Sequence, residues 1–138
     1  MPAKDIFHDA VRIGLEKDGW VIIDDPLRIR SGRVDMQIDL GAEKIIGAEK
    51  GEEKIAVEIK SFISSSNISE FHTALDQFLN YRLALKDQQP NRFLYLAVPL
   101  GAYQTFFNLP FVETAIEHFQ LSLVVYDPNH EVIVTWKK

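Results

Sequence analysis

Residues 55 to 62 read Ile-Ala-Val-Glu-Ile-Lys-Ser-Phe, an apolar, strand-forming stretch with two charged residues inside it. Such a run predicts a strand that is largely buried in a sheet. Glu58 and Lys60 are two positions apart, so on a strand they share one face, with side-chain bases about 7 Å apart. A carboxylate and an ammonium at that spacing can converge on a metal ion and its bound phosphate.

The chemistry that suits this pair is metal-assisted phosphoryl transfer. Glu58 would hold the cation, the Ile59 carbonyl could add a ligand, and Lys60 could orient water or stabilise charge on a phosphoryl group. A second Glu-x-Lys, Glu52-Glu53-Lys54, lies in a polar turn. Only the first has apolar flanks, and these flanks carry the signal. The alternative interpretation of Glu58 and Lys60 is a salt-bridged strand face at a sheet edge.

Periodicities along the chain predict alternating helices and strands. Helical spacing of apolar residues covers residues 5 to 18, about 68 to 87, and 111 to 119. Gly19 is placed to end the first helix, and Asn67 with Glu70 resembles a capping box at the start of the second. Apolar or alternating runs predict strands over residues 20 to 23, 34 to 40, 44 to 48, 53 to 62, 93 to 98, 121 to 126 and 131 to 136.

These elements predict one α/β domain over residues 1 to 138. Residues 34 to 62 are expected to form a hairpin or a three-stranded meander. The long helix then connects this unit to a parallel strand over residues 93 to 98, as in a βαβ unit. The last strand is expected to lie antiparallel at an edge of the sheet.

Composition narrows the function further. The chain has no cysteine, which excludes disulfides and thiolate chemistry and favours hard cations at any metal site. Neither a leader peptide nor a membrane span is recognisable, so we expect a cytoplasmic protein. The formal net charge of −5 argues against coating nucleic acid by bulk electrostatics. The densest positive segment, residues 28 to 33, contains three arginines and is interpreted as a solvated loop.

A metal site needs a second acid besides Glu58. Asp39 is the preferred candidate, because it ends an alternating strand just before Gly41, where the backbone can bend. A regular hairpin turning near residues 50 and 51 would set Glu58 level with Glu43 or Lys44, which makes Glu43 the rival ligand. On the long helix, Gln77 and Tyr81 are spaced i, i+4 and project from one face that packs near this strand.

In order and placement, Asp39, Glu58-Ile59-Lys60, and Gln77 with Tyr81 resemble the D…(D/E)-x-K…Q-x-x-x-Y signature of restriction-endonuclease-like proteins. Ile38, rather than proline, precedes Asp39, so the leading proline of that motif is absent. Across essentially the whole chain the sequence also resembles the XisH family, on the segments His8-Asp9-Ala10-Val11, Asp18-Gly19-Trp20, Asp39-Leu40-Gly41, Ala56-Val57-Glu58-Ile59-Lys60-Ser61-Phe62 and Leu94-Tyr95-Leu96-Ala97-Val98-Pro99.

This resemblance implies a fold and a role. The fold would be restriction-endonuclease-like, a central mixed β-sheet flanked by helices. The role would be control of programmed excision of the fdxN DNA element in cyanobacteria, with a site-specific recombinase and a small companion protein, XisI. DNA is an implied partner, and a homodimer is a further possible assembly.

The sequence leaves two hypotheses for the function of the protein. In one, the protein is a noncatalytic controlling factor that keeps the nuclease-like fold. In the other it is a Mg²⁺-dependent DNA endonuclease or nickase, with Mn²⁺ as a substitute. Asp39 and Glu58 would then bind the metal, Lys60 would be the catalytic lysine, and Gln77 and Tyr81 would support the site.

Overall fold

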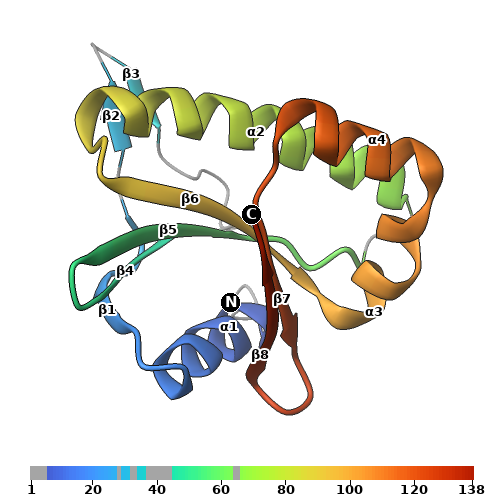
Figure 1. The fold of residues 1–138 in the computed structure, drawn as a ribbon, viewed down its shortest axis with the longest axis horizontal. Helices are drawn as coiled ribbons and strands as arrows, with labels where there is room; N and C mark the ends of the chain where they lie inside the picture. The colour runs from blue at the N-terminus through green and yellow to red at the C-terminus, as the bar shows by residue number, and fades with distance from the viewer. Residues whose placement is uncertain (1–5, 28, 32–33, 37–44, 64–65) are drawn as a thin grey trace, which may run out of the picture.

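The computed structural model describes residues 6–27, 29–31, 34–36, 45–63 and 66–138. Within them, six strands form one mixed sheet in the order β1-β4-β5-β6-β7-β8. These strands are β1 (Val21–Asp24), β4 (Ile45–Lys50), β5 (Glu53–Ile59), β6 (Arg92–Pro99), β7 (Leu123–Asp127) and β8 (Val132–Lys137). Figure 1 shows α1 (Ile6–Lys17) on one face, and α2 (Asn67–Gln88) and α4 (Pro110–Phe119) on the other. The predicted α/β class is therefore confirmed.

Strand β5 lies in the interior of this sheet. It pairs antiparallel with β4 across the turn at Gly51, whose φ of 61° suits glycine, and parallel with β6 on its other side. Helix α2 connects β5 to β6, so the predicted βαβ unit is confirmed. Strand β8 pairs antiparallel with β7 and ends the strand order, which confirms the predicted antiparallel edge.

The predicted meander is wrong in its first strand. Val34–Met36 forms β3, which pairs antiparallel with β2 (Ile29–Ser31) in a separate two-stranded sheet beside α2 (Figure 1). The neighbour of β4 is instead β1. Alternation identifies a half-buried strand but not its partner, because every such strand carries the same pattern. The same hairpin corrects the loop expected over residues 28 to 33, since Arg30 lies in β2.

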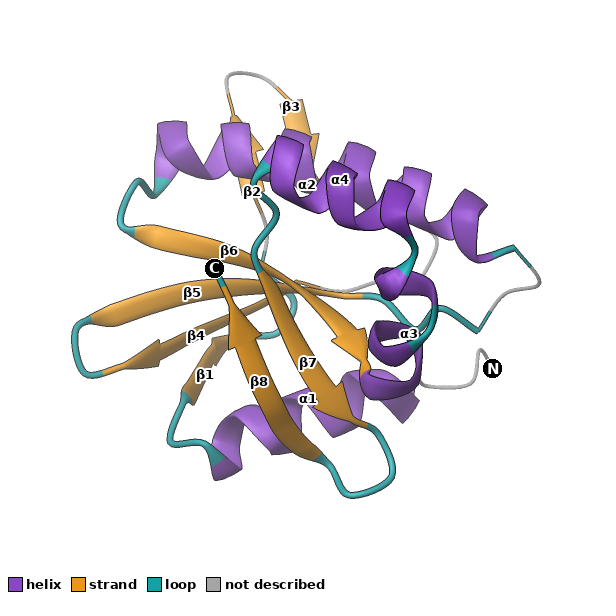
Figure 2. Ribbon diagram, turned by 45° about the vertical axis from the view of Figure 1, so that its right-hand side comes forward, coloured by secondary structure: helices purple, strands orange, loops and turns teal. Residues whose placement is uncertain are grey.

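Each face of the sheet carries its own apolar core, beneath the helices that cover that face in Figure 2. The α1 face joins side chains of α1 to alternate residues of the central strands, including Leu15, Val57, Ile59, Ala97 and Val124. The opposite face joins α2 and α4 to the intervening residues, including Ala56, Phe71, Phe78, Leu96 and Val125. In the part of the chain that the structure describes, no helix is both long and apolar enough to span a membrane.

Local signals at helix ends are confirmed in one case and corrected in another. Helix α1 ends at Lys17, and Gly19 follows with φ of 92°. The N-cap of α2 is Ser66, whose hydroxyl accepts a hydrogen bond from the Ser69 N–H at 3.3 Å, so the predicted Asn67 capping box is wrong. Between β6 and α4 the chain forms the short helix α3 (Leu100–Gln104), followed by the 3₁₀ turn η2 (Phe106–Asn108).

Candidate functional site

The central feature is a pair of opposite charges buried between β5 and α2. Glu58 and Lys60 are both 0% exposed, and the Lys60 Nζ lies 3.7 Å from the Glu58 Oε2. The pair lies on an interior strand, which contradicts the alternative of a salt-bridged face at the sheet edge. Burying two charges costs several kcal/mol per ion before their attraction is counted, so such a pair calls for a specific reason.

Helix α2 supplies the third member of this group. The Lys60 Nζ donates a hydrogen bond to the Gln77 Oε1 at 2.5 Å. Gln77 is half-buried, and Tyr81, one turn later on the same helix, is 6% exposed and belongs to the core on this face. The predicted convergence of Gln77 with Lys60 is therefore present, whereas Tyr81 lies nearby as part of the apolar packing.

The hairpin register places Glu58 opposite Ile45. The sequence had suggested Glu43 or Lys44, and the difference arises because the turn is centred on Gly51 and Glu52, one position later than assumed, which shifts the register by up to two residues. Asp39 and Glu43, the two candidates for the second acid, lie outside the described residues. The choice between them stays a prediction.

The backbone around Lys60 is held from three directions. The Lys60 N–H donates to the Ala97 carbonyl at 3.1 Å, and the Tyr126 hydroxyl donates to the Lys60 carbonyl at 2.9 Å. Two residues on, Phe62 adopts φ of 52°, and its N–H donates to the Glu70 Oε2 at 2.7 Å. Glu70 thus ties the start of α2 to the exit of β5, and because the N-cap is Ser66, Glu70 lies one position beyond N3 of the helix.

Among the described residues, no cluster of three or more acidic or histidine side chains could hold a metal ion. Glu58 offers one carboxylate, and a hard cation needs further oxygen ligands. Asp39 and Glu43, the acids that the sequence suggests as a second carboxylate ligand, lie outside the described residues. What the described residues provide is a carboxylate, an ammonium and an amide grouped in a dry environment, where electrostatic interactions are strong.

Comparison with known proteins places the chain in a family. A family model described as XisH protein matches residues 1–134. The chain belongs to the XisH family. Among curated proteins, no significant match was found.

Two solved structures of XisH-type proteins resemble this one closely. An XisH family protein from Nostoc punctiforme PCC 73102 is 53% identical, with a TM-score of 0.91, and the match covers 97% of this chain and 100% of that one. An fdxN element excision controlling factor protein from Anabaena variabilis is 51% identical, with a TM-score of 0.89, covering 97% and 99% of the two chains.

This XisH-family chain has a cleft of 480 Å³ at the carboxyl ends of β5, β6 and β7. Ser61, Asn67, Thr105 and Asp127 are among its lining residues. The hydrogen bond with His130 is the main reason why the pKa of Asp127 is lowered, and the Asn129 and His130 N–H groups lower it further. The carboxylate is thus already occupied by its own turn, which makes it a poor ligand for a substrate.

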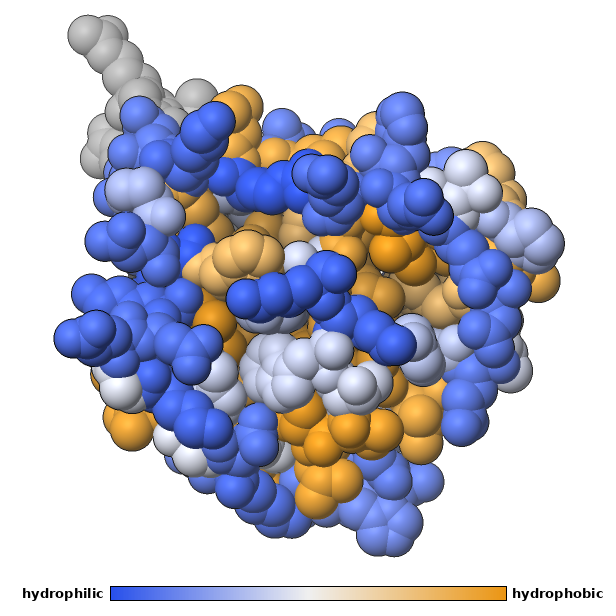
Figure 3. Space-filling model, in the orientation of Figure 1, coloured by the Kyte–Doolittle hydropathy of each residue, from blue (hydrophilic) through white to orange (hydrophobic). Residues whose placement is uncertain are grey.

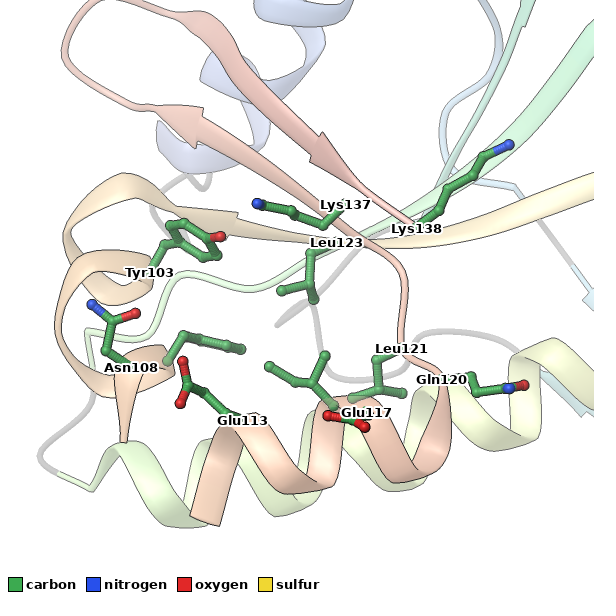
Figure 4. Close-up of a pocket in the computed structure, with 11 residues that line it drawn as sticks. Tyr103, Asn108, Glu113, Glu117, Gln120, Leu121, Leu123, Lys137 and Lys138 are labelled. Atoms are coloured by element: carbon green, nitrogen blue, oxygen red, sulfur yellow. The ribbon is translucent and has the colours of Figure 1, made fainter. Parts of the chain in front are cut away.

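A second cleft of this XisH-family fold, of 440 Å³, lies between α4 and β8. Figure 3 shows hydrophobic surface there, bordered by hydrophilic side chains. Glu113 and Glu117 project from α4 on one wall, and Lys137 lies on the other, above Leu121 and Leu123 (Figure 4). These charged side chains are exposed and therefore solvated, so they lack the dry environment of Glu58 and Lys60.

Sequence reasoning missed two polar groupings in this XisH-family chain. The Asp25 Oδ2 lies 2.8 Å from the His8 Nε2 and accepts a hydrogen bond from the Arg12 Nη1 at 2.5 Å. The Tyr126 contact with the Lys60 carbonyl is the other. Helical spacing of His8 and Arg12 could have suggested a shared partner, but nothing local marks a tyrosine in an apolar strand.

Proposed function

We propose that this XisH-family protein controls the excision of a DNA element, acting with a site-specific recombinase and the small companion protein XisI. The observation that carries the proposal is membership of the family over almost the whole chain, together with a close relative named as an excision controlling factor. We further propose that the sheet and helices form a restriction-endonuclease-like fold. Its support is the signature of Glu58, Lys60 and Gln77, whose last two members are hydrogen-bonded.

The burial of the charged pair favours a controlling role over that of a nuclease active in this conformation. A general acid, base or metal ligand must come within hydrogen-bond or coordination distance of the reacting groups. Glu58 and Lys60 are 0% exposed, so a phosphodiester cannot touch them in this conformation. Contact with DNA would require the surrounding structure to open.

An excision assay tests the proposed role directly. A reporter plasmid that carries a recombination element is incubated with the recombinase and the companion protein, with or without this chain. We expect excision to fall at least tenfold when the chain is omitted. Equal excision in both reactions would contradict the proposal. An electrophoretic mobility-shift assay then measures whether the chain itself binds the DNA element. Binding would indicate a DNA-binding role, and its absence would indicate a role through the partner proteins.

A Mg²⁺-dependent nickase is the second candidate, and the juxtaposition of Glu58, Lys60 and Gln77 favours it. Glu58 with Asp39 would hold Mg²⁺ or Mn²⁺, which would supply Lewis-acid activation of the phosphodiester. Lys60 would stabilise the charge that develops on the phosphate, and Gln77 would fix the ammonium in place. Tyr81 would support Gln77 through packing.

Nicking of supercoiled and branched DNA with Mg²⁺ or Mn²⁺ tests this candidate. Glu58→Ala should reduce metal-dependent nicking by roughly a hundredfold or more. The matched control is Glu52→Ala, at the exposed Glu-x-Lys of the β4–β5 turn, which should leave nicking unchanged. Absence of nicking by every protein would leave the controlling role as the function and remove the catalytic one.

A further inference from the structure

The hydrogen bond between Tyr126 and Lys60 has a specific origin in the sheet. In the parallel pairing of β5 with β6, Ile59 lies opposite Ala97, so Lys60 lies opposite Val98. The Lys60 N–H donates to the Ala97 carbonyl. In a regular parallel ladder the Lys60 carbonyl would then accept from the N–H of residue 99. Residue 99 is proline, which has no N–H.

Tyr126 replaces the missing donor. It is the residue of β7 that lies opposite Pro99, it is 0% exposed, and its hydroxyl donates to the Lys60 carbonyl at 2.9 Å. Tyr126 belongs to the core on the α1 face, whereas the Lys60 side chain meets Gln77 on the α2 face. The tyrosine therefore fixes the peptide group after Lys60 from the side opposite to the charged group.

This hydrogen bond lies just beyond the end of β5, where the regular backbone hydrogen bonds of the strand stop. Strand β5 ends at Ile59, and by Phe62 the backbone is in the left-handed region, with φ of 52°. Without the tyrosine hydroxyl, the buried Lys60 carbonyl would lose this hydrogen-bond donor. The direction in which the Lys60 ammonium leaves the strand depends on that peptide.

We propose that Tyr126 is a positioning residue for Lys60, because its hydroxyl supplies the ladder hydrogen bond that Pro99 cannot. The relevance of this role to phosphodiester chemistry rests on the proposed function; the positioning itself does not. Tyr126→Phe removes the hydroxyl and keeps the ring. The matched control is Tyr95→Phe, a buried tyrosine of β6 whose ring lies in the same core.

Lysine side-chain NMR of ¹⁵N-labelled protein gives the primary measurement, with the Lys60 ammonium assigned through Lys60→Arg. We expect the Lys60 Nζ signal to move or broaden in Tyr126→Phe and to stay unchanged in Tyr95→Phe. Adding Pro99→Ala to Tyr126→Phe restores an N–H at residue 99 and should return the signal toward the wild-type position. A merely structural role of the ring would not be rescued by an amide donor on another strand.

An unchanged Lys60 signal in Tyr126→Phe, or no rescue by Pro99→Ala, would overturn the proposal. Should Tyr126→Phe fail to fold, recovery of folding in the double variant supports it, and continued failure overturns it. Where wild-type protein nicks DNA, Tyr126→Phe should lower kcat about tenfold with KM unchanged. If wild-type protein nicks nothing, the catalytic candidate fails, while the NMR measurement still decides the role of Tyr126.

Discussion

The two faces of the central sheet bury different chemistry. On the α1 face, Val57, Ile59, Ala97 and Val124 form an apolar layer with at most 1% exposure. On the α2 face of the same strand β5, Glu58 and Lys60 are equally buried, yet both are charged side chains. Successive positions of β5 thus carry apolar side chains on one face and charged side chains on the other, although a strand buried on both faces normally carries apolar residues on both.

This difference between the two faces shows that the fold does not need charged side chains at these positions of β5. An apolar residue on the α2 face would bury surface at roughly 25 cal/mol per Å² without desolvating a charge. The α1 face demonstrates that this chain can build such a layer. The charged pair therefore costs stability that an apolar pair would not cost, and the function proposed above supplies a reason for it. Each face makes its own predictions.

The largest effect is expected on the α2 face. Lys60→Met should lower the free energy of unfolding by about 4 kcal/mol, because it leaves the Glu58 carboxylate buried beside an apolar side chain. Urea unfolding at pH 7 measures it. Adding Glu58→Gln should recover much of the loss. Lys60→Met as stable as the wild type would show that the carboxylate does not depend on the Lys60 ammonium.

On the α1 face, Leu15→Ala should cost about 3 kcal/mol of unfolding free energy, because Leu15 is 0% exposed and its removal leaves a cavity. Thermal and urea unfolding measure the loss. The NMR signal of the Lys60 ammonium should not move, since the substitution keeps the hydrogen bond from the Tyr126 hydroxyl to the Lys60 carbonyl. A shift of that signal would mean that packing on the α1 face affects Lys60 by a route other than this hydrogen bond.

Gln77→Ala should destabilise the protein by about 2 kcal/mol, since it removes the amide that accepts a hydrogen bond from a buried ammonium. Lys86→Ala, an exposed position on the same helix, serves as the control and should change the unfolding free energy by less than about 0.5 kcal/mol. Equal stabilities for the two variants would show that Gln77 contributes nothing to holding Lys60.

The smallest effect is expected where an acid and its partner lie at the surface. His130 is the main reason for the lowered pKa of Asp127, so His130→Ala should raise that pKa, as followed by carboxyl ¹³C shifts. A lowered folded-state pKa contributes stability above the unfolded-state value, and this contribution is lost as pH falls through the folded-state pKa. An unchanged pKa would assign the shift to the turn backbone.

Much of this architecture follows from local pattern. The spacing of apolar residues located α1, α2, α4 and the interior strands, because burial on one face imposes a period that the chain must display. Strand pairing could be predicted where the connection between two strands is short or has a fixed handedness, as in the β5–α2–β6 unit. The partner of β3, which is β2, could not be predicted, because a half-buried strand shows the same alternation of apolar and polar residues beside any neighbour.

Of the candidate site, Glu58, Lys60 and Gln77 were predicted from sequence and are brought together by the structure. Charges in an apolar strand are visible in the sequence as a conflict with burial. Tyr126 was not predicted, because it resembles every other buried aromatic residue of a core strand. Its role appears only when Pro99 is seen opposite it in the sheet.

The sequence by itself determined the class of fold, the strand that carries the charged pair, and the face that this pair shares with Gln77, because periodicity is a local consequence of burial. Only the tertiary structure decided that β1, rather than β3, lies beside β4, that the pair is wholly enclosed, and that Tyr126 replaces an absent backbone donor. Those features depend on which distant segments meet, and no local pattern encodes the identity of a partner.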